Sequence, residues 1–259
     1  MKTKSFAKVN IFLKITGLKE FQGKTLHTLN SRFMLVENLY DTIEFVPCQC
    51  DSFTIEGLDI PKKQNIIYKA YKALNQYTGD LDILEFFYNH KVVIKKNIPL
   101  GAGLGGGSSN AATFINMVKK YCNLKISTKE LADIGATLGA DVPFFIYGYK
   151  SANVSGFGEI IEEFKEEPLN LEIITPPIHC DTAAVYKEYD KEFLDKTNPN
   201  SGLTLMLQKS KNLLKHFKSP EELNDLYLPA LKLYPELKDY YKEGYFFSGS
   251  GSSFFRLKE

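Results

Sequence analysis

The sequence predicts an α+β protein of two domains, and three observations lead to that class. The chain has 259 residues, a length that fits either one large domain or two modest ones. Hydrophobic residues make up 44% of it and charged residues 24%, as in ordinary globular proteins, which excludes disordered and fibrous classes. Strand-like and helix-like segments are mixed without strict alternation, which favours α+β over a doubly wound sheet.

The first hundred or so residues predict mainly strands. Residues 6–15 alternate, so that one face is apolar while Lys8 and Asn10 lie side by side on the other. From Asn65 the apolar spacing suits a helix that Gly79 closes. We expect further strands at 40–46, 52–56 and 86–99.

The middle of the chain predicts two helices and then a strand. After a glycine-rich segment, Ser108 or Ser109 can cap the first helix. A capping-box pattern at 127–130 opens the second, which ends near Gly139. Asp141 then lies just beyond a helix end and before a strand-like apolar run at 144–149.

The remaining segments predict a second mixed domain. Residues 156–159 are expected to form a hairpin turn, and the polar segment 166–170 is the best candidate linker. A strand begins at Leu171. We expect helical stretches near 183–194, 201–217, 221–226 and 235–242, and a last strand pair within 244–258.

Charge and cysteine usage restrict the partners and the compartment. Lys and Arg total 32 against 31 Asp and Glu, so no overall field attracts a nucleic acid. The start of the chain does not fit a signal peptide, and no apolar run is long enough to span a membrane. We expect a cytoplasmic protein with no nucleic-acid or membrane partner, no metal site built by the chain, and reduced thiols at Cys48, Cys50, Cys122 and Cys180.

The distribution of glycine is the most informative feature. Five of the 18 glycines lie between Gly101 and Gly107, between a predicted strand and a predicted helix. Glycines let backbone N–H groups converge, and a helix N-terminus adds further N–H groups with a partial positive charge. This arrangement predicts a site for phosphate groups.

Two common phosphate loops are excluded. A dinucleotide-binding unit needs an acidic residue about 20 residues further on, where this chain has 124–127 without a carboxylate. A Walker loop needs a lysine after its last glycine, where Ser108 stands.

A second small-residue cluster, 248–253, either closes the phosphate site or forms a structural turn. Spacing reveals no partner for His90, His179 or His216.

Four ordered motifs resemble those of the GHMP small-molecule kinases. They are AKVNIFLKITG near the start, PLGAGLGGGSSNAA in the middle, LGADVPFF after it and SGSGSSFF near the end. The resemblance implies an N-terminal ATP-binding domain, 1–160, similar to the second domain of ribosomal protein S5, and a ferredoxin-like C-terminal domain, 161–259. It also implies small-molecule substrates, ATP with Mg²⁺ as cofactors, and a monomer or weak homodimer.

Within this family the motifs are most similar to the kinases that phosphorylate the 2-hydroxyl of 4-diphosphocytidyl-2-C-methyl-D-erythritol in the non-mevalonate route to isoprenoid precursors. The resemblance implies that Asp141 is the catalytic base and Lys8 its electrostatic partner. It assigns substrate contacts to Asn10, His27, Asp141, Gly249 and Ser250. It assigns ATP contacts to Asn65 and to Pro99, Leu100, Gly101, Ala102, Gly103, Leu104, Gly105, Gly106, Gly107, Ser108 and Ser109.

The chain departs from the family pattern beside His27. Family members carry a tyrosine before this histidine to stack on cytosine, where this chain has Leu26. Phe33 and Tyr186 are the candidates to replace it. Two alternatives remain open from the sequence: a relative acting on homoserine, mevalonate or a sugar, and a nucleotide-binding module without catalysis.

Overall fold

The computed structural model describes residues 1–21, 23–79 and 81–258, and the chain divides into two compact units. Unit 1 comprises Met1–Ala7, Glu37–Ile98 and Gly106–Gly148. Unit 2 comprises Lys8–Val36, Pro99–Gly105 and the chain from Tyr149 onward. Each unit is therefore assembled from segments that are distant in sequence. The division between residues 160 and 161 that the sequence suggests stays a prediction.

Two long strands, β1 (Lys2–Phe21) and β2 (Lys24–Pro47), pair with each other and run through both units. The strand predicted at 6–15 is confirmed within β1. Both faces of β1 are buried there, because Val9 is 0% exposed while Lys8 and Asn10 are only 3% and 2% exposed. The polar pair is thus an interior feature, and buried polar groups need hydrogen-bond partners.

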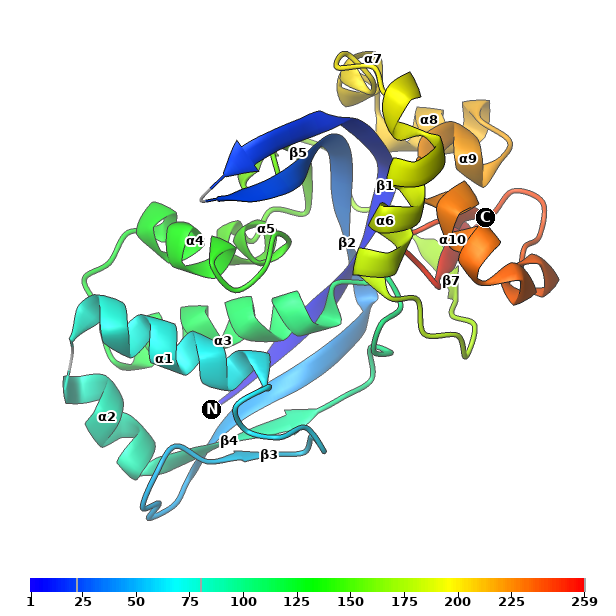
Figure 1. Ribbon diagram of the computed structural model, residues 1–259. Helices are drawn as coiled ribbons and strands as arrows, with labels where there is room; N and C mark the ends of the chain where they lie inside the picture. The colour runs from blue at the N-terminus through cyan, green and yellow to red at the C-terminus, as the bar shows by residue number, and fades with distance from the viewer. Residues whose placement is uncertain (22, 80, 259) are drawn as a thin grey trace. The chain divides into compact units, whose positions relative to one another are not determined.

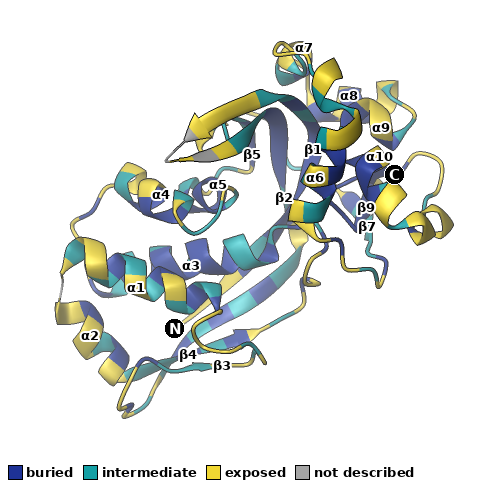
Figure 2. Cartoon of the chain, viewed as in Figure 1, coloured by how far each residue is buried: buried dark blue, intermediate teal, exposed yellow. Residues whose placement is uncertain are grey.

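Unit 1 is a sheet covered by helices. The C-terminal part of β2 pairs antiparallel with β4 (His90–Lys95), from Thr42 opposite Lys95 to Pro47 opposite His90, and β3 (Ile55–Glu56) pairs parallel with β4. The helices of this unit are α1 (Ile66–Thr78), α2 (Leu81–Tyr88), α3 (Gly106–Tyr121), α4 (Thr128–Ala136) and α5 (Val142–Tyr147). Figure 1 shows α1 and α3 side by side along β2 and β4. Figure 2 shows α3 as mostly buried, with Phe114 and Ile115 at 0% exposure.

Local capping signals locate two of these helices. The Asn65 side chain accepts a hydrogen bond from the N–H of Ile67, and Gly79 ends α1 in the left-handed conformation at φ 60°. Ser127 and Glu130 form the predicted capping box at the start of α4. Both helices begin where the sequence predicts, because a cap depends on neighbouring residues alone.

Three predicted elements differ in the structure. The strand expected at 86–99 is shorter, because α2 continues to Tyr88 and β4 starts at His90. The strand expected at 144–149 is helix α5, which Gly148 ends in the left-handed conformation. A short, wholly apolar run fits a buried strand and a buried helix equally well, so periodicity could not separate them. Helix α3 begins at Gly106, before the serines expected to cap it.

Unit 2 contains two groups of strands. Ser31–Met34 of β2 pair antiparallel with β5 (Ser151–Ser155), and β5 pairs with β6 (Ile160–Glu163) through the hairpin turn predicted at 156–159. A separate three-stranded sheet has the order β7-β9-β8. Its strands are β7 (Leu171–Ile174), β8 (Phe246–Phe247) and β9 (Phe254–Leu257), which confirms the strand from Leu171 and the last strand pair.

The helices of unit 2 overlap the predicted stretches, but the stretch predicted at 201–217 is two short helices and one further helix was missed. They are α6 (Thr182–Glu192), η1 (Leu194–Lys196), α7 (Leu203–Met206), α8 (Ser210–His216), α9 (Pro220–Leu223), α10 (Tyr227–Leu233) and η2 (Pro235–Asp239). Helix α10 was not predicted, and it carries Pro229. That proline lies in the first helical turn, where its missing N–H costs no helical hydrogen bond.

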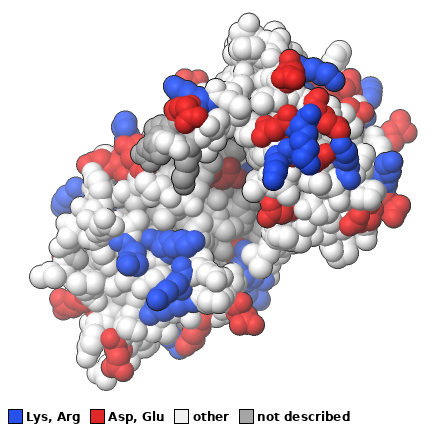
Figure 3. Space-filling view, viewed as in Figure 1, with Lys and Arg blue, Asp and Glu red and all other residues white. Residues whose placement is uncertain are grey.

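On the face shown in Figure 3, basic and acidic side chains gather over α6, where Lys232 pairs with Glu188 (2.8 Å).

A buried arginine joins several segments of unit 2. Arg32 of β2 is 0% exposed, and its guanidinium donates to Asn153 Oδ1 (2.7 Å), to the Met206 carbonyl (2.7 Å) and to Glu166 (3.3 Å). Burial is the largest influence on this group and lowers the pKa of Arg32 to about 10, while Glu166 opposes that effect. The cation is therefore retained at neutral pH because acceptors surround it.

The cysteines differ in part from the sequence expectation. Cys48 and Cys50 are joined in a disulfide, so the expectation of four reduced thiols is wrong for this pair. Their α-carbons lie 5.7 Å apart, within the usual range for a disulfide. Cys122 and Cys180 are free and buried.

Among the described residues, no helix is long and apolar enough to cross a membrane.

Candidate active site

The glycine loop contains a series of left-handed residues. Gly101, Gly103 and Gly105 have φ angles of +63°, +72° and +66°, while the side chains of Ala102 and Leu104 between them are 3% and 1% exposed. The buried side chains anchor the loop, and the alternating glycines turn successive N–H groups toward one side. Such an arrangement forms a concavity that binds anions. The chain then passes from unit 2 into unit 1 between Gly105 and Gly106.

The C-terminal small-residue cluster packs against this loop within unit 2. Ser248 Oγ donates to the Gly103 carbonyl (3.0 Å), and the Ser253 N–H donates to the Ala102 carbonyl (3.1 Å). A β-carbon added at Gly103 would lie 2.1 Å from the Ser248 carbonyl oxygen, so only glycine fits. Gly249 approaches the same loop, since a β-carbon there would lie 3.2 Å from the Gly103 oxygen. Ser250 Oγ bonds instead to Thr182 Oγ1 (2.8 Å).

Within unit 1, the start of α3 continues the phosphate loop. Its first turn consists of Gly106, Gly107, Ser108 and Ser109, whose N–H groups have no partners within the helix. The Ser109 hydroxyl bonds to Ser5 (2.7 Å). The helix dipole places a partial positive charge at this turn, which favours bound phosphate.

A buried carboxylate that sequence reasoning missed holds the strand end before the loop. Asp41 is 0% exposed, and its Oδ1 accepts from the N–H groups of Asn97 (2.7 Å) and Ile98 (2.8 Å). Its Oδ2 accepts from Asn110 Nδ2 (2.9 Å) and from Lys96 Nζ. Lys96 in turn reaches the α3 N-terminus, because a β-carbon added at Gly106 would lie 3.2 Å from its Nζ. Asp41 thus fixes both the strand end and an ammonium at the helix start.

Lys8 and Asn10 form the interior pair that the strand pattern predicted. Lys8 Nζ donates to Asn10 Oδ1 (2.6 Å) and to the Gly103 carbonyl (3.4 Å), and it lies 4.6 Å from the centre of the Phe33 ring. The Lys8 backbone N–H also donates to the Leu104 carbonyl (3.0 Å). Asn10 Nδ2 donates to Ser31 Oγ (3.0 Å). The chain therefore holds a buried ammonium at the glycine loop within unit 2.

Asp141 lies in unit 1, two residues after Gly139, which approaches the first turn of α3. It precedes α5 at the N-cap position, but its carboxylate makes no capping hydrogen bond there. Two residues earlier, a β-carbon added at Gly139 would lie 3.7 Å from Ser108 Oγ. Asp141 is half-buried. Lys8 belongs to unit 2 and Asp141 to unit 1, so their pairing stays a prediction.

His27 has a carboxylate partner and an aromatic neighbour in unit 2. Its Nε2 lies 2.6 Å from Asp190 Oδ1, and its ring centre lies 4.7 Å from that of Tyr186. Phe33, the other candidate to replace the missing tyrosine, lies instead under the Lys8 ammonium. Asp190 is 163 residues away in sequence and gave no signal there. The structure thus places Tyr186, not Phe33, beside His27.

Asn65 is buried at 4% exposure, and its Oδ1 caps α1 through the N–H of Ile67 (2.9 Å). A structural role is therefore established for it by geometry, whereas its contact with adenine stays a prediction.

Comparisons with known proteins identify the family of the chain. The model of the family "GHMP kinases N terminal domain" matches residues 65–149. The 4-diphosphocytidyl-2-C-methyl-D-erythritol kinase of Sulfurovum sp. (strain NBC37-1) is 51% identical over 98% of this chain and 97% of its own. The kinase of the same name from Helicobacter pylori (strain J99 / ATCC 700824) is 38% identical over 98% of this chain and 93% of its own.

The chain belongs to the 4-diphosphocytidyl-2-C-methyl-D-erythritol kinase family, within the GHMP kinases. A crystal structure of a 4-(cytidine 5'-diphospho)-2C-methyl-D-erythritol kinase matches 100% of this chain and 90% of that chain, with a TM-score of 0.76 and 28% identity. The mevalonate kinase of Methanococcus jannaschii matches with a TM-score of 0.65 at 16% identity, which indicates a shared fold. This is the α+β, two-domain GHMP kinase fold that the sequence predicts, and kinases of this family use ATP.

The thiol nearest the C-terminal cluster is unreactive. A β-carbon added at Gly251 would lie 3.0 Å from Cys180 Sγ, and burial raises the pKa of the Cys180 thiol to about 12. The thiol therefore stays protonated at neutral pH and cannot act as a nucleophile.

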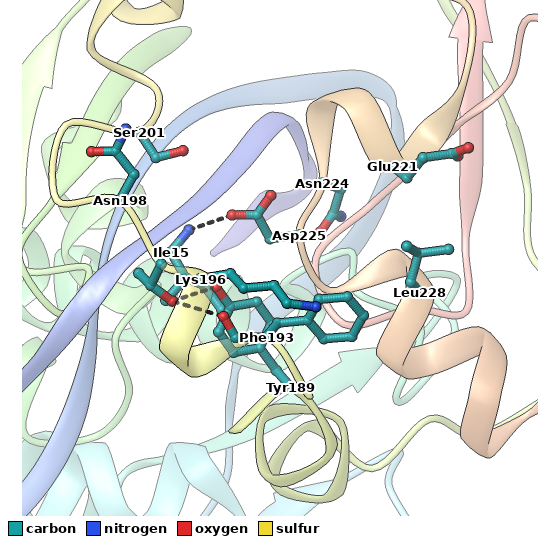
Figure 4. Close-up of a pocket in the computed structure, with 11 residues that line it drawn as sticks. Ile15, Tyr189, Phe193, Lys196, Asn198, Ser201, Glu221, Asn224, Asp225 and Leu228 are labelled. Carbon is teal, nitrogen blue, oxygen red and sulfur yellow. Dashed lines mark hydrogen bonds between the residues drawn. The ribbon is translucent and has the colours of Figure 1, made fainter. Parts of the chain in front are cut away.

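A cavity of about 220 Å³ lies in unit 2 beside β1 and helices α6 and α10 (Figure 4). Asp225 on its wall accepts from the N–H of Ile15 (2.8 Å) and from Lys14 Nζ (2.7 Å). Tyr189 also lines the cavity and presents its ring to the His27 ring at 83°. Tyr189 therefore belongs both to the cavity wall and to the surroundings of His27.

Proposed function

We propose that this protein transfers the γ-phosphoryl group of ATP to the 2-hydroxyl of 4-diphosphocytidyl-2-C-methyl-D-erythritol. The observation that carries the proposal is the left-handed glycine series at 101, 103 and 105, which leads directly into the N-terminus of α3. Full-length relatives carry the name of this kinase, which supports the acceptor. The substrates are small molecules, and the enzyme acts in the cytoplasm as a monomer or weak homodimer.

ATP phosphates are bound by the loop from Pro99 to Ser109 through its backbone N–H groups. Among the described residues, no three His, Cys, Asp or Glu side chains gather to hold a metal ion. This fits Mg²⁺, which usually keeps several waters and binds through one or two protein oxygens plus substrate phosphates. The Ser108 hydroxyl, in the first turn of α3, would supply one such oxygen. When bound, Mg²⁺ would neutralise negative charge on the phosphates.

Asp141 accepts the proton from the 2-hydroxyl while that oxygen forms its bond to the γ-phosphorus and ADP leaves. A carboxylate is suited to this step because its oxygens can accept the proton directly from the hydroxyl. Lys8 supplies positive charge for the developing negative charge on the transferred group. Asn10 orients Lys8, since its Oδ1 accepts from the ammonium at 2.6 Å.

His27 recognises the cytosine. In the neutral imidazole, one nitrogen donates and the other accepts. If Nε2–H donates to Asp190, at 2.6 Å, then Nδ1 carries the lone pair and accepts from the cytosine amino group. Tyr186 offers its ring for stacking in place of the family tyrosine. Gly249 and Ser250 contact the acceptor.

ADP release by the purified protein tests the proposal, with ATP and either the cytidyl acceptor, homoserine, mevalonate or no acceptor. We expect release only with the cytidyl acceptor. Release with homoserine or mevalonate alone would assign a different acceptor within the fold. ATP binding without any acceptor-dependent release would identify a nucleotide-binding module.

A further inference from the structure

His179 lies against the glycine loop within unit 2. It belongs to the connection between β7 and α6 (Figure 1), about 80 residues after the loop. A β-carbon added at Gly101 would lie 2.0 Å from His179 Nδ1 and 2.3 Å from its Cε1. The Nδ1–Cε1 edge of the imidazole therefore covers the α-carbon of Gly101. The ring occupies the space that a side chain at position 101 would need.

The imidazole is accessible and makes no hydrogen bond to the part of the chain that the structure describes. His179 is exposed, whereas Cys180 beside it is 2% exposed. His90 shows the contrasting case, because its Nδ1 lies 3.0 Å from the Phe86 carbonyl and its ring stacks on Phe86. His179 is therefore a polar ring at the rim of the loop whose ring nitrogens bond to none of the described residues.

We propose that His179 is a phosphate-binding residue of the nucleotide site, donating a ring N–H to a phosphate oxygen of ATP on the glycine loop. This inference rests on the proposed function, because it requires ATP at that loop. Backbone N–H groups of the glycine loop provide the other donors. The left-handed glycines at 101, 103 and 105 set the orientation of these groups. A side-chain donor beside Gly101 adds to these backbone donors within unit 2. Imidazole donates in its neutral and charged forms, so the contact persists across neutral pH.

A purely structural role, in which the His179 ring only shields Gly101 and donates no hydrogen bond, makes a different prediction. Two substitutions separate the alternatives. His179→Leu keeps apolar bulk beside Gly101 but has no donor, whereas His179→Gln retains an N–H group of similar reach. His216→Leu is the matched control, because His216 is an exposed histidine of the same unit on α8.

The measurement is the dissociation constant of a non-hydrolysable ATP analogue, together with kcat and the KM values for ATP and acceptor. Losing a hydrogen bond to a charged group should weaken analogue binding and raise the KM for ATP about tenfold in His179→Leu. We expect His179→Gln and His216→Leu to stay within about threefold of the wild type, and the acceptor KM to be unchanged. His179→Ala replaces the Leu variant if that one does not fold.

Unchanged analogue affinity in His179→Leu would overturn the inference. Equal weakening by Leu and Gln would also overturn it, since packing and not a donor would then be responsible. If the wild-type protein binds no ATP analogue, the proposed function fails and the inference fails with it. Binding of the analogue by wild type and by His179→Leu alike removes the inference alone.

Discussion

Asp41→Asn tests whether a single buried carboxylate stabilises the strand end before the phosphate loop. Each Asp41 oxygen accepts two hydrogen bonds: Oδ1 from the N–H groups of Asn97 and Ile98, and Oδ2 from Asn110 and Lys96. An amide keeps only one of these oxygens. Whichever way the new side chain is turned, its NH₂ group faces two donors in a fully buried position. The Lys96 ammonium also loses its counter-charge.

The expected loss is about 3 to 5 kcal/mol in the free energy of unfolding, the range for removing one partner of a buried ion pair. Asp133→Asn is the control, because the Asp133 pair with Lys129 spans 2.9 Å between side chains that are 65% and 76% exposed. An exposed pair of that spacing contributes about 0.3 to 0.5 kcal/mol.

The assay is urea unfolding followed by circular dichroism, with the midpoint and slope measured for both variants. We expect a clearly lower midpoint for Asp41→Asn and a nearly unchanged one for Asp133→Asn. A loss below about 1 kcal/mol for Asp41→Asn, close to that of the control, would refute the reasoning, because the four hydrogen bonds could not then be strong.

Three further substitutions test the site. Asp141→Asn should abolish turnover while leaving ATP affinity within a few-fold, and retained turnover would remove Asp141 as the base. Gly103→Ala should abolish binding of the ATP analogue, because its β-carbon would lie 2.1 Å from the Ser248 carbonyl oxygen; Gly79→Ala, with a similar φ of +60° and nothing within 4 Å, is its control. If both variants bind normally, the packing of the loop is not as described. Tyr186→Ala should raise the KM for the cytidyl acceptor about tenfold through lost stacking on cytosine, with the KM for ATP unchanged. An unchanged acceptor KM would exclude Tyr186 from the cytosine site.

The elements that sequence reasoning located correctly are those with local causes. Asn65 and the Ser127 capping box mark helix starts through hydrogen bonds to residues two and three positions away. The 2-residue period of β1 likewise placed Lys8 beside Asn10. By contrast, the apolar run 144–149 could not be assigned from its own residues. It forms helix α5, in which Val142 to Ile146 are all buried, so no exposed face reveals a helical period in the sequence.

The same distinction applies to the site. The glycine loop was predictable because its conformation depends on residues that lack a β-carbon, at adjacent positions. Asp41 was not, since its partner Lys96 is 55 residues away, and Asp190 is 163 residues from His27. Such pairs are formed only when the chain folds, and a single sequence carries no signal for them. The contact of His179 with Gly101 belongs to this second class.

The most direct test of the central claim is the mass of the cytidyl acceptor after incubation with the protein, ATP and Mg²⁺. The claim predicts an acceptor heavier by one phosphoryl group, with one ADP formed for each acceptor converted. An acceptor of unchanged mass, with ADP formation no greater than in its absence, would contradict it.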